Sequence, residues 1–354
     1  MSTLTRPNTK YSKLLIYYFS GTGNARQAAK WIIEEAMRIG IETQLIEITK
    51  SKSHNKVEVS SSTLIGFCYP THGFNAPQII LKTIWFFPQY GGQDVFLLNT
   101  RAGLKLSKIF IPGLSGLAQM LPALFLRLKG YRLVGFRPLD LPSNWIFFHP
   151  GLKEKVVKSI FKRCERITRK FAIKILRGDR VYRAWFDLPL DLAVSPISLA
   201  YYLIGRFSLA KTFFANSSCT GCGLCIKSCP LQAIRFIDNR PFWTFKCESC
   251  MRCINHCPNR AIETAHGFSF LIWWLIFSVI PISLASLINR QLNFSLANSV
   301  LANWIYYGLG LILIGLSYYG VHFLLRFKWI NSVFKLTSLT AYKFWRRYKA
   351  PSKD

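Results

Sequence analysis

The sequence predicts an α/β protein with a doubly wound parallel sheet, followed by a small cysteine-rich domain and two apolar spanning segments. Short apolar runs alternate with stretches long enough for crossover helices, eight of the ten cysteines lie between Cys219 and Cys257, and two long uncharged stretches lie near the C-terminus. A length of 354 residues suggests about two domains, and the 51% hydrophobic content excludes a disordered chain.

The first predicted strand is Leu14–Phe19, a continuous apolar run of the kind that is buried on both faces of a parallel sheet. Ala25–Arg38 follows with apolar residues at helical spacing, and Gly40 marks the end of this helix. Further apolar runs predict the remaining strands at Gln44–Ile48, Thr63–Tyr69, Val95–Asn99 and Arg132–Phe136.

A long helix is predicted at Leu152–Arg177, where Gly178 ends it and an apolar face closes the sheet. Twelve basic and three acidic residues between Lys153 and Arg183 make its other face strongly positive. We interpret this face as solvated, with contact to anionic lipid as the second interpretation. Phe186–Thr212 is apolar but interrupted by charges and prolines, so we expect an interfacial or packed connector.

Two C-terminal stretches predict transmembrane helices. Gly267–Asn289 has 23 residues without a charge, and Gln291–Leu325 has 35. Each can span ~30 Å of hydrocarbon at ~1.5 Å per residue. A buried core helix is the alternative, but such a helix is rarely apolar all round at this length.

Charge predicts the topology of this pair. The connection near Arg290 carries one basic residue, whereas Arg326–Asp354 carries eight basic residues and one acidic residue. Because Lys and Arg are retained on the cytoplasmic side, we expect a hairpin in the cell membrane with the redox domains and the tail in the cytoplasm. Met1–Lys13 is polar, and the apolar run after it is too short for a signal peptide.

The cysteines form two copies of one motif, Cys219-x2-Cys222-x2-Cys225-x3-Cys229-Pro230 and Cys247-x2-Cys250-x2-Cys253-x3-Cys257-Pro258. Both match the two-cluster bacterial run, in which the fourth cysteine ligates the other [4Fe-4S] cluster. The predicted ligands of the first cluster are Cys219, Cys222, Cys225 and Cys257, and those of the second are Cys247, Cys250, Cys253 and Cys229. Gly221 and Gly223 permit the tight turn of the first copy.

Structural zinc is the alternative for these cysteines, but a zinc site uses four ligands in two pairs and does not need the repeated triple. Thr212–Ala265 is similar to a bacterial-type 2[4Fe-4S] ferredoxin domain. Cys68 and Cys164 lie outside it, and we expect both to be small buried hydrophobes.

The loop after the first strand predicts an anion site, because backbone N–H groups and the dipole of the following helix attract phosphate there. It lacks the lysine of a Walker motif and the spacing of a dinucleotide fingerprint. Its pattern resembles the FMN phosphate loop of flavodoxins, which implies FMN contacts from Ser20, Gly21, Thr22, Gly23, Asn24 and Ala25.

The same resemblance implies which residues flank the flavin ring. They lie in the loops after the third and fourth strands, at Tyr69, His72, Phe74, Asn99, Thr100, Arg101 and Gly103. Tyr69, His72 or Phe74 would stack on the ring. An ordinary surface position is the alternative for His72, and a surface ion pair is the alternative for Arg101.

The order of modules resembles the flavodoxin–ferredoxin fusion proteins of anaerobic bacteria and archaea, over roughly Lys13 to Ala265. Asn144 fits that family's short proline-asparagine motif after the last strand. The resemblance and the apolar stretches imply a flavodoxin-like domain at 1–180, a connector at 181–212, an α+β two-cluster ferredoxin domain at 213–266, two transmembrane helices at 267–326 and a basic cytoplasmic tail at 327–354.

The predicted function is a membrane-anchored electron carrier with two [4Fe-4S] clusters and FMN. The formal net charge of +30 favours anionic partners; we expect a redox partner protein and the membrane, and no nucleic acid. No catalytic dyad or triad is visible in the sequence. Two alternatives stay open: a flavin-dependent reductase of a quinone-like substrate, and a flavin-free membrane scaffold or sensor.

Overall fold

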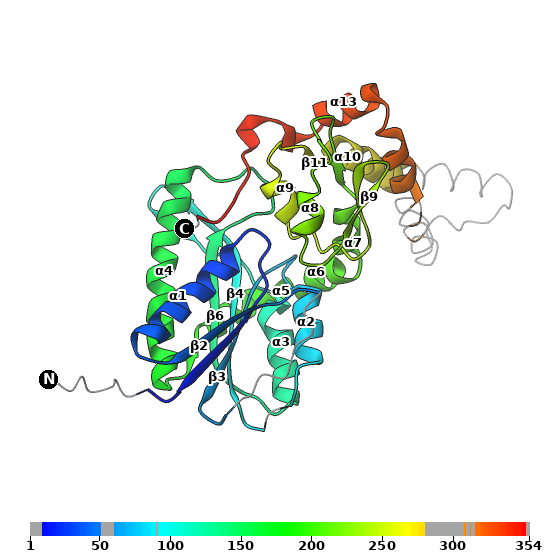
Figure 1. The fold of residues 1–354 in the computed structure, drawn as a ribbon. Helices are drawn as coiled ribbons and strands as arrows, with labels where there is room; N and C mark the ends of the chain where they lie inside the picture. Colours follow the sequence, from blue (N-terminus) through cyan, green and yellow to red (C-terminus); the bar gives the residue numbers. More distant parts are fainter. Residues whose placement is uncertain are drawn as a thin grey trace.

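A parallel sheet forms the centre of the N-terminal half (Figure 1). This computed structural model describes residues 9–50, 60–89, 91–279, 308, 312 and 316–351. The parallel strands are β1 (Lys13–Tyr18), β2 (Glu42–Glu47), β3 (Thr63–Pro70), β4 (Asp94–Leu106) and β6 (Arg132–Pro142). Their order, β2-β1-β3-β4-β6, is the flavodoxin-like order of doubly wound sheets, which confirms the predicted fold.

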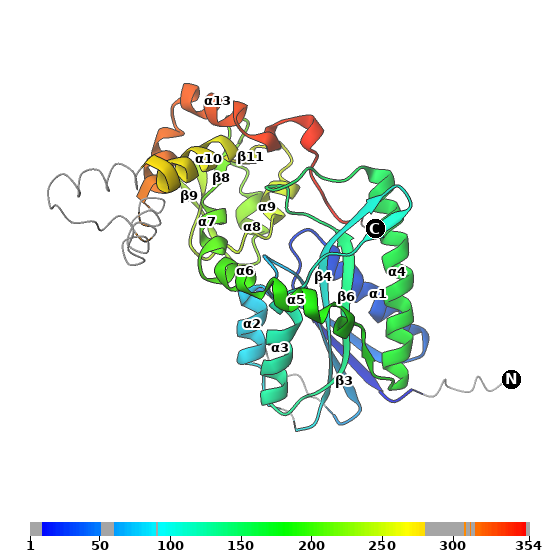
Figure 2. The ribbon, with the colours of Figure 1, turned by 180° about the vertical axis from the view of Figure 1, so that it is seen from behind.

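Helices cover both faces of this sheet (Figures 1 and 2). The side chains of β1 alternate between these two faces. Leu14 and Ile16 pack in the core with α1 (Asn24–Arg38) and α4 (Glu154–Arg177). Leu15 and Tyr17 point to the other face and pack with α2 (Gln78–Trp85) and α3 (Leu117–Leu128). Burial on both faces explains why the strands read as continuous apolar runs.

Two strands extend beyond their predicted ends. β4 continues past Asn99 to Leu106 and pairs there with the antiparallel strand β5 (Ile109–Ile111). β6 continues past Phe136 to Pro142, and the two-residue strand β7 (Val181–Tyr182) pairs beside it. The apolar runs end where the strands leave the doubly covered part of the sheet, so hydropathy alone predicted strands that were too short.

The cysteine-bearing module lies at the carboxyl end of the sheet (Figure 1). It consists of two small antiparallel sheets of two strands each and two short helices, namely β8 (Phe213–Ala215) with β11 (Ile262–Thr264), β9 (Ile234–Ile237) with β10 (Arg240–Trp243), α8 (Leu224–Lys227) and α9 (Arg252–His256). Its buried side chains belong to the same apolar cluster as those on the α2 and α3 face of the sheet. One hydrophobic core therefore runs through both modules.

The connector folds into short helical segments: η1 (Arg183–Asp187), α5 (Leu188–Ala193), α6 (Ser195–Ala200), η2 (Tyr201–Gly205) and α7 (Arg206–Ala210). No single helix among the described residues is long and apolar enough to cross a membrane. The bent pair 183–193 and 195–210, with an angle of 76° between its halves, has the length and composition of a span.

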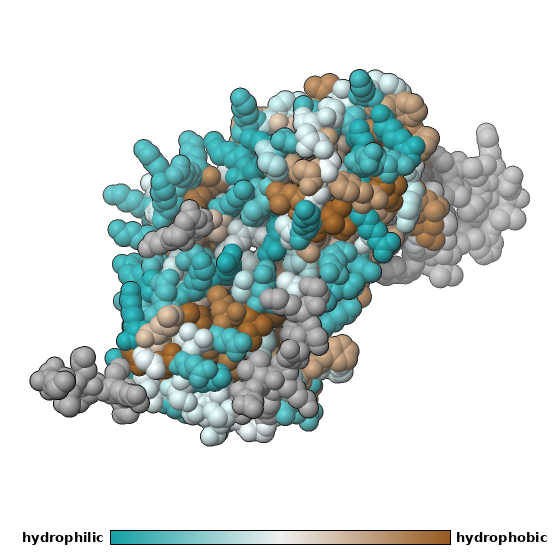
Figure 3. All heavy atoms as spheres, viewed as in Figure 1, coloured by the Kyte–Doolittle hydropathy of each residue, from teal (hydrophilic) through white to brown (hydrophobic). Residues whose placement is uncertain are grey.

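Most of the two predicted transmembrane stretches lies outside the described residues. The first is described only where it begins, in α10 (His266–Trp274) and η3 (Leu275–Val279). Large apolar side chains such as Trp273 are exposed on α10. Figure 3 shows apolar residues on the surface of the cysteine-bearing module, whereas the side of the molecule formed by α1 and α4 is mostly hydrophilic.

The C-terminal segment, predicted as a tail at 327–354, packs on both modules in its described part. It forms α13 (Lys328–Leu336), η4 (Leu339–Ala341) and η5 (Lys343–Trp345), and then runs to the beginning of α1 (Figure 1). The indole N–H of Trp345 donates to the carbonyl oxygen of Ile146 over 2.5 Å. We call residues 338–350 the C-terminal strap.

Candidate functional site

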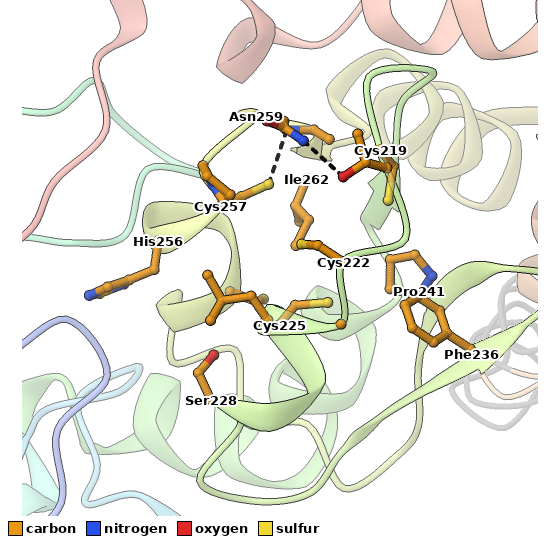
Figure 4. Close-up of a pocket in the computed structure, with 16 residues that line it drawn as sticks. Cys219, Cys222, Cys225, Ser228, Phe236, Pro241, His256, Cys257, Asn259 and Ile262 are labelled. Atoms are coloured by element: carbon orange, nitrogen blue, oxygen red, sulfur yellow. Dashed lines mark hydrogen bonds between the residues drawn. The ribbon is translucent and has the colours of Figure 1, made fainter.

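Five cysteines from the two motifs line one cavity of the cysteine-bearing module (Figure 4), namely Cys219, Cys222, Cys225, Cys253 and Cys257. Cys219, Cys222 and Cys225 come from the loop before and into α8, and Cys257 comes from the end of α9. All are free thiols. Among the described residues, no group of three or more His, Cys, Asp or Glu side chains is arranged to hold a single metal ion.

The second predicted set includes the two buried cysteines of the motifs, Cys247 and Cys250, whereas its other members, Cys229 and Cys253, are half-buried like Cys219, Cys225 and Cys257. Cys247 and Cys250 are 9% and 8% exposed, whereas Cys222 is exposed. Burial, with a smaller contribution from the neighbouring Cys229, raises the pKa of the Cys250 thiol to about 11. Burial and then Cys250 raise the pKa of Cys253, to which Cys229 also contributes. Cys229 therefore lies with the second motif, and ligation at these buried thiols requires a cation that compensates for their deprotonation.

The two motifs share one backbone conformation. Gly221 and Gly223 have φ angles of 67° and 71°, the left-handed conformation that the expected tight turn requires of glycine. Ser249 and Met251 stand at the equivalent positions of the second motif, with φ angles of 52° and 61°. A left-handed conformation costs a residue with a Cβ atom roughly 1–2 kcal/mol, so the second loop holds strain that the arrangement of its cysteines explains.

Each fourth cysteine also accepts a backbone hydrogen bond. The Ala233 N–H donates to Cys229 Sγ over 3.3 Å, and the Ala261 N–H donates to Cys257 Sγ over 3.3 Å. Hydrogen bonds to sulfur stabilise the thiolate and are one of the means by which a protein tunes the reduction potential of a cluster.

The phosphate loop follows β1 and ends at the N-terminus of α1. Ser20 and Thr22 are both 3% exposed, and Ser20 Oγ accepts from the Gly23 N–H over 3.1 Å. Asn144 Nδ2 donates to Thr22 Oγ1 over 2.8 Å, so the residue of the proline-asparagine motif braces this loop. The hydroxyl groups and the positive end of the helix dipole make the loop suited to a phosphate group.

A cavity of about 430 Å³ opens beside the phosphate loop, a volume typical of cofactor sites. Its lining includes seven of the residues predicted to contact FMN, namely Ser20, Gly21, Thr22, Asn24, Phe74, Thr100 and Arg101. It also includes three aromatic residues that the sequence reasoning missed, Trp145, Phe148 and Tyr201. Trp145 directly follows Asn144 and could have been found from that motif, but Tyr201 comes from the connector and gave no local signal.

The other predicted contacts do not line this cavity; they are Gly23, Ala25, Tyr69, His72, Asn99 and Gly103. Tyr69 is fully buried, and its hydroxyl donates to the carbonyl oxygen of Ala118 over 2.9 Å. His72 is 2% exposed, and burial lowers its pKa to about 3, so the ring is neutral and packs in the core. Tyr69 and His72 therefore do not provide a stacking surface, because their strand ends turn their side chains inward.

Arg101 forms a buried ion-pair network rather than a surface pair. Its guanidinium contacts Asp140 Oδ1 at 2.7 Å and Asp187 Oδ2 at 2.8 Å, and its side chain is 4% exposed. Burial alone would lower its pKa, but the two carboxylates outweigh burial and raise it. Arg101 is therefore a fixed cation in the wall of the 430 Å³ cavity.

The phosphate loop is in direct contact with the second cysteine motif. A Cβ atom on Gly21 would lie 2.1 Å from the carbonyl oxygen of Cys250, so only glycine allows this approach. Arg252 joins the two sites, because its guanidinium donates to the carbonyl oxygens of Ser20 at 2.6 Å and Gly21 at 3.0 Å. The same group also contacts Glu47 at 3.0 Å.

Tyr201 and the strap complete this junction. The ring of Tyr201 packs against Trp145 at a centroid distance of 5.4 Å, and burial raises its pKa, with Glu248 and Cys247 close enough to add to the shift. On the other side, the N–H of Ala350 donates to the carbonyl oxygen of Thr22 over 2.9 Å, and Tyr348 hydrogen-bonds to Asn24. The strap therefore covers the outside of the phosphate loop.

Lys211 is a further charge that the sequence reasoning missed. Its ammonium lies 4.1 Å from the ring centroid of Phe245 and 4.2 Å from that of Tyr318. Burial lowers its pKa to about 8, although the nearby Cys247 opposes this shift. A cation beside the buried cysteines favours the more negative, reduced state of any centre they hold.

Residues 211–259 match the family model of the 4Fe-4S dicluster domain. An iron-sulfur module thus follows a flavodoxin-like module in this chain. The structure is also similar to flavodoxin 1 from Bacillus cereus, with 17% identity, a TM-score of 0.32 and coverage of 46% of this chain and 98% of that one. The match to the dicluster domain indicates electron transfer as the role of the module at residues 211–259.

Two further solved structures show comparable likeness. A flavodoxin from the domain Archaea has 15% identity and a TM-score of 0.30, and general stress protein 14 from Treponema denticola, in complex with FMN, has 13% identity and a TM-score of 0.28. Each match covers 46% of this chain and 98% of the other. No curated protein matches the chain.

The placement of Cys229 leads to a prediction about the buried centre. In Cys229→Ala we expect loss of the iron held by Cys247, Cys250 and Cys253, because Cys229 completes that set. Cys257→Ala is the matched variant and should lose the iron at the exposed set instead. Iron analysis and EPR of the reduced variants distinguish the two centres. Loss of the exposed centre alone in Cys229→Ala would reverse the assignment.

Proposed function

We propose that the chain is a membrane-associated electron-transfer protein that holds two [4Fe-4S] clusters and FMN. The observation that carries the proposal is the contact of the phosphate loop, at Ser20 and Gly21, with the turn Cys250–Arg252. A flavin supplies exchange between one-electron and two-electron carriers, and iron-sulfur clusters supply single electrons. A protein that brings the two sites into contact is built for electron exchange between them.

The donor sets fit the clusters. In this proposal each cluster takes four thiols, three from one motif and the last from the other, which is the ligation pattern of two-cluster ferredoxins. The exposed set, with Cys222, offers electrons access from a partner protein, and the buried set lies against the phosphate loop. This arrangement supports a path for electrons from the exposed set at the surface, through the buried set, to the large cavity.

The large cavity fits FMN. Ser20 and Thr22 provide hydroxyl groups at the N-terminus of α1, where a phosphate monoester is favoured. Trp145 and Tyr201 provide aromatic walls for a planar ring. The fixed cation of Arg101 adds positive charge to the lining, which favours an anionic reduced cofactor.

Thr22→Ala should weaken FMN binding about tenfold or more, because a hydrogen bond to a charged phosphate is worth roughly 1.5 to 3 kcal/mol. Thr43→Ala, at the amino end of β2, is the control and should bind FMN like the wild type. Fluorescence titration of flavin-free protein measures both affinities. A wild type that binds no FMN in excess would support the flavin-free scaffold instead.

Arg252→Met should slow electron exchange between the clusters and the flavin. The substitution removes charge-assisted hydrogen bonds worth roughly 1.5 to 3 kcal/mol each, and these bonds hold the two loops together. Arg235→Met, which changes an exposed arginine of the same module, is the control. Stopped-flow bleaching of flavin absorbance, with electrons supplied through a reduced ferredoxin, measures the rate. An unchanged rate in Arg252→Met with full iron and flavin content would refute this path.

We also propose that the protein is an integral membrane protein with its redox modules in the cytoplasm. Support comes from the uncharged stretches Gly267–Asn289 and Gln291–Leu325 and from the basic C-terminal segment. Reporter fusions at Asp354 and near Arg290 test the topology. We expect the C-terminal reporter to be active in the cytoplasm and the reporter near Arg290 to be active outside it. A C-terminal reporter that is active only outside the cytoplasm would rule out the hairpin.

A further inference from the structure

A second polar cavity, of about 160 Å³, lies behind the wall of the large one. It is lined by residues from β4, β5, β6, α4 and η1 and from the segment that follows β5. Its charged lining consists of Arg101, Arg137, Arg163, Arg183, Asp140 and Asp187. Arg101 lines both cavities, so a ligand here would lie one side chain away from the large cavity.

The charges around this cavity do not balance. Both carboxylates contact Arg101, and Asp140 Oδ1 also accepts from the N–H of Gly113 over 2.9 Å. Among the described residues, Arg137, Arg163 and Arg183 form no ion pair of their own. Four guanidinium groups against two carboxylates leave an excess of two positive charges on the lining.

Arg137 is the arginine most affected by this excess of positive charge. Its Nε is buried and has no hydrogen-bond partner among the described residues. Burial lowers its pKa to about 10, and the nearby Arg183 adds to this shift. A half-buried guanidinium with a buried N–H group that has no acceptor is costly, so an anion that accepts from this group would stabilise the fold.

The other two arginines are held by aromatic rings rather than by carboxylates. The guanidinium carbon of Arg163 lies 4.6 Å from the ring centroid of Phe110, and that of Arg183 lies 4.6 Å from the ring centroid of Phe186. Stacking fixes a guanidinium plane while leaving its N–H groups able to donate. Three arginines from three separate elements therefore line the cavity, and none of them forms an ion pair with a carboxylate of the described residues.

We propose that this cavity binds a phosphate dianion, either inorganic phosphate or the phosphoryl group of a small monoester. A phosphate monoester carries a charge of about −1.5 to −2 at pH 7, which matches the excess on the lining. Guanidinium groups recognise such oxyanions through paired N–H donors. A carboxylate would leave one positive charge uncompensated, and the small volume excludes a whole nucleotide.

Thermal unfolding of the full-length protein tests the site. The protein is kept in excess FMN, so that the phosphate loop is occupied, and phosphate is compared with chloride at equal ionic strength. Phosphate should raise the Tm of the wild type, because a ligand that binds only the folded state stabilises it. Arg137→Met should lose this shift and keep its iron and flavin. Arg166→Met, an exposed arginine on α4 outside the cavity, should retain the shift.

Further variants separate this site from the phosphate loop. Thr22→Ala should retain the phosphate-dependent shift, since it alters the other site. Arg163→Met should lose it, and it serves as the second test if Arg137→Met does not fold. A wild type whose Tm does not respond to phosphate, an equal shift in Arg137→Met, or an equal shift with acetate would each overturn the proposal. None of these results depends on electron transfer.

Discussion

The contact between Gly21 and the carbonyl oxygen of Cys250 is the constraint on which the arrangement of the two modules depends. It places a loop built for phosphate against a loop built for sulfur ligation, at a distance that only a residue without a Cβ atom allows. Arg252 stabilises the contact by donating hydrogen bonds to the phosphate loop. The apolar core that the two modules share also holds them together. The modules are therefore one unit, with no flexible hinge required between the two sites.

Burial divides the cysteines into two unequal environments. The set with Cys222 meets solvent, whereas Cys247 and Cys250 lie under the connector and the phosphate loop, with Lys211 close by. Exposure, nearby charge and hydrogen bonds to sulfur all influence a cluster's potential. The same motif thus appears twice in the sequence but in two electrostatic settings.

Positive charge is concentrated at the carboxyl ends of β4 and β6. Arg101 is neutralised by Asp140 and Asp187, and within the described part of the chain this pairing leaves Arg137, Arg163 and Arg183 without carboxylate partners. A fold tolerates such an excess only if an anion, solvent or a stacked ring compensates for it. The ends of parallel strands are also where doubly wound sheets bind ligands, so both cavities lie where this topology favours binding.

The sequence by itself determined the features that depend on local spacing. The cysteine motifs, the apolar strands and the loop from Ser20 to Ala25 are each specified by residues within a few positions of one another, and the strand order confirmed the doubly wound sheet. Only the tertiary structure decided how the phosphate loop, the second cysteine motif and the C-terminal strap contact one another. Arg252 meets Gly21 across 231 positions, and Tyr348 meets Asn24 across 324. It also decided that Tyr69 and His72 face the core while Trp145 and Tyr201 face the cavity, because the direction of a side chain at a strand end depends on how distant segments pack around it.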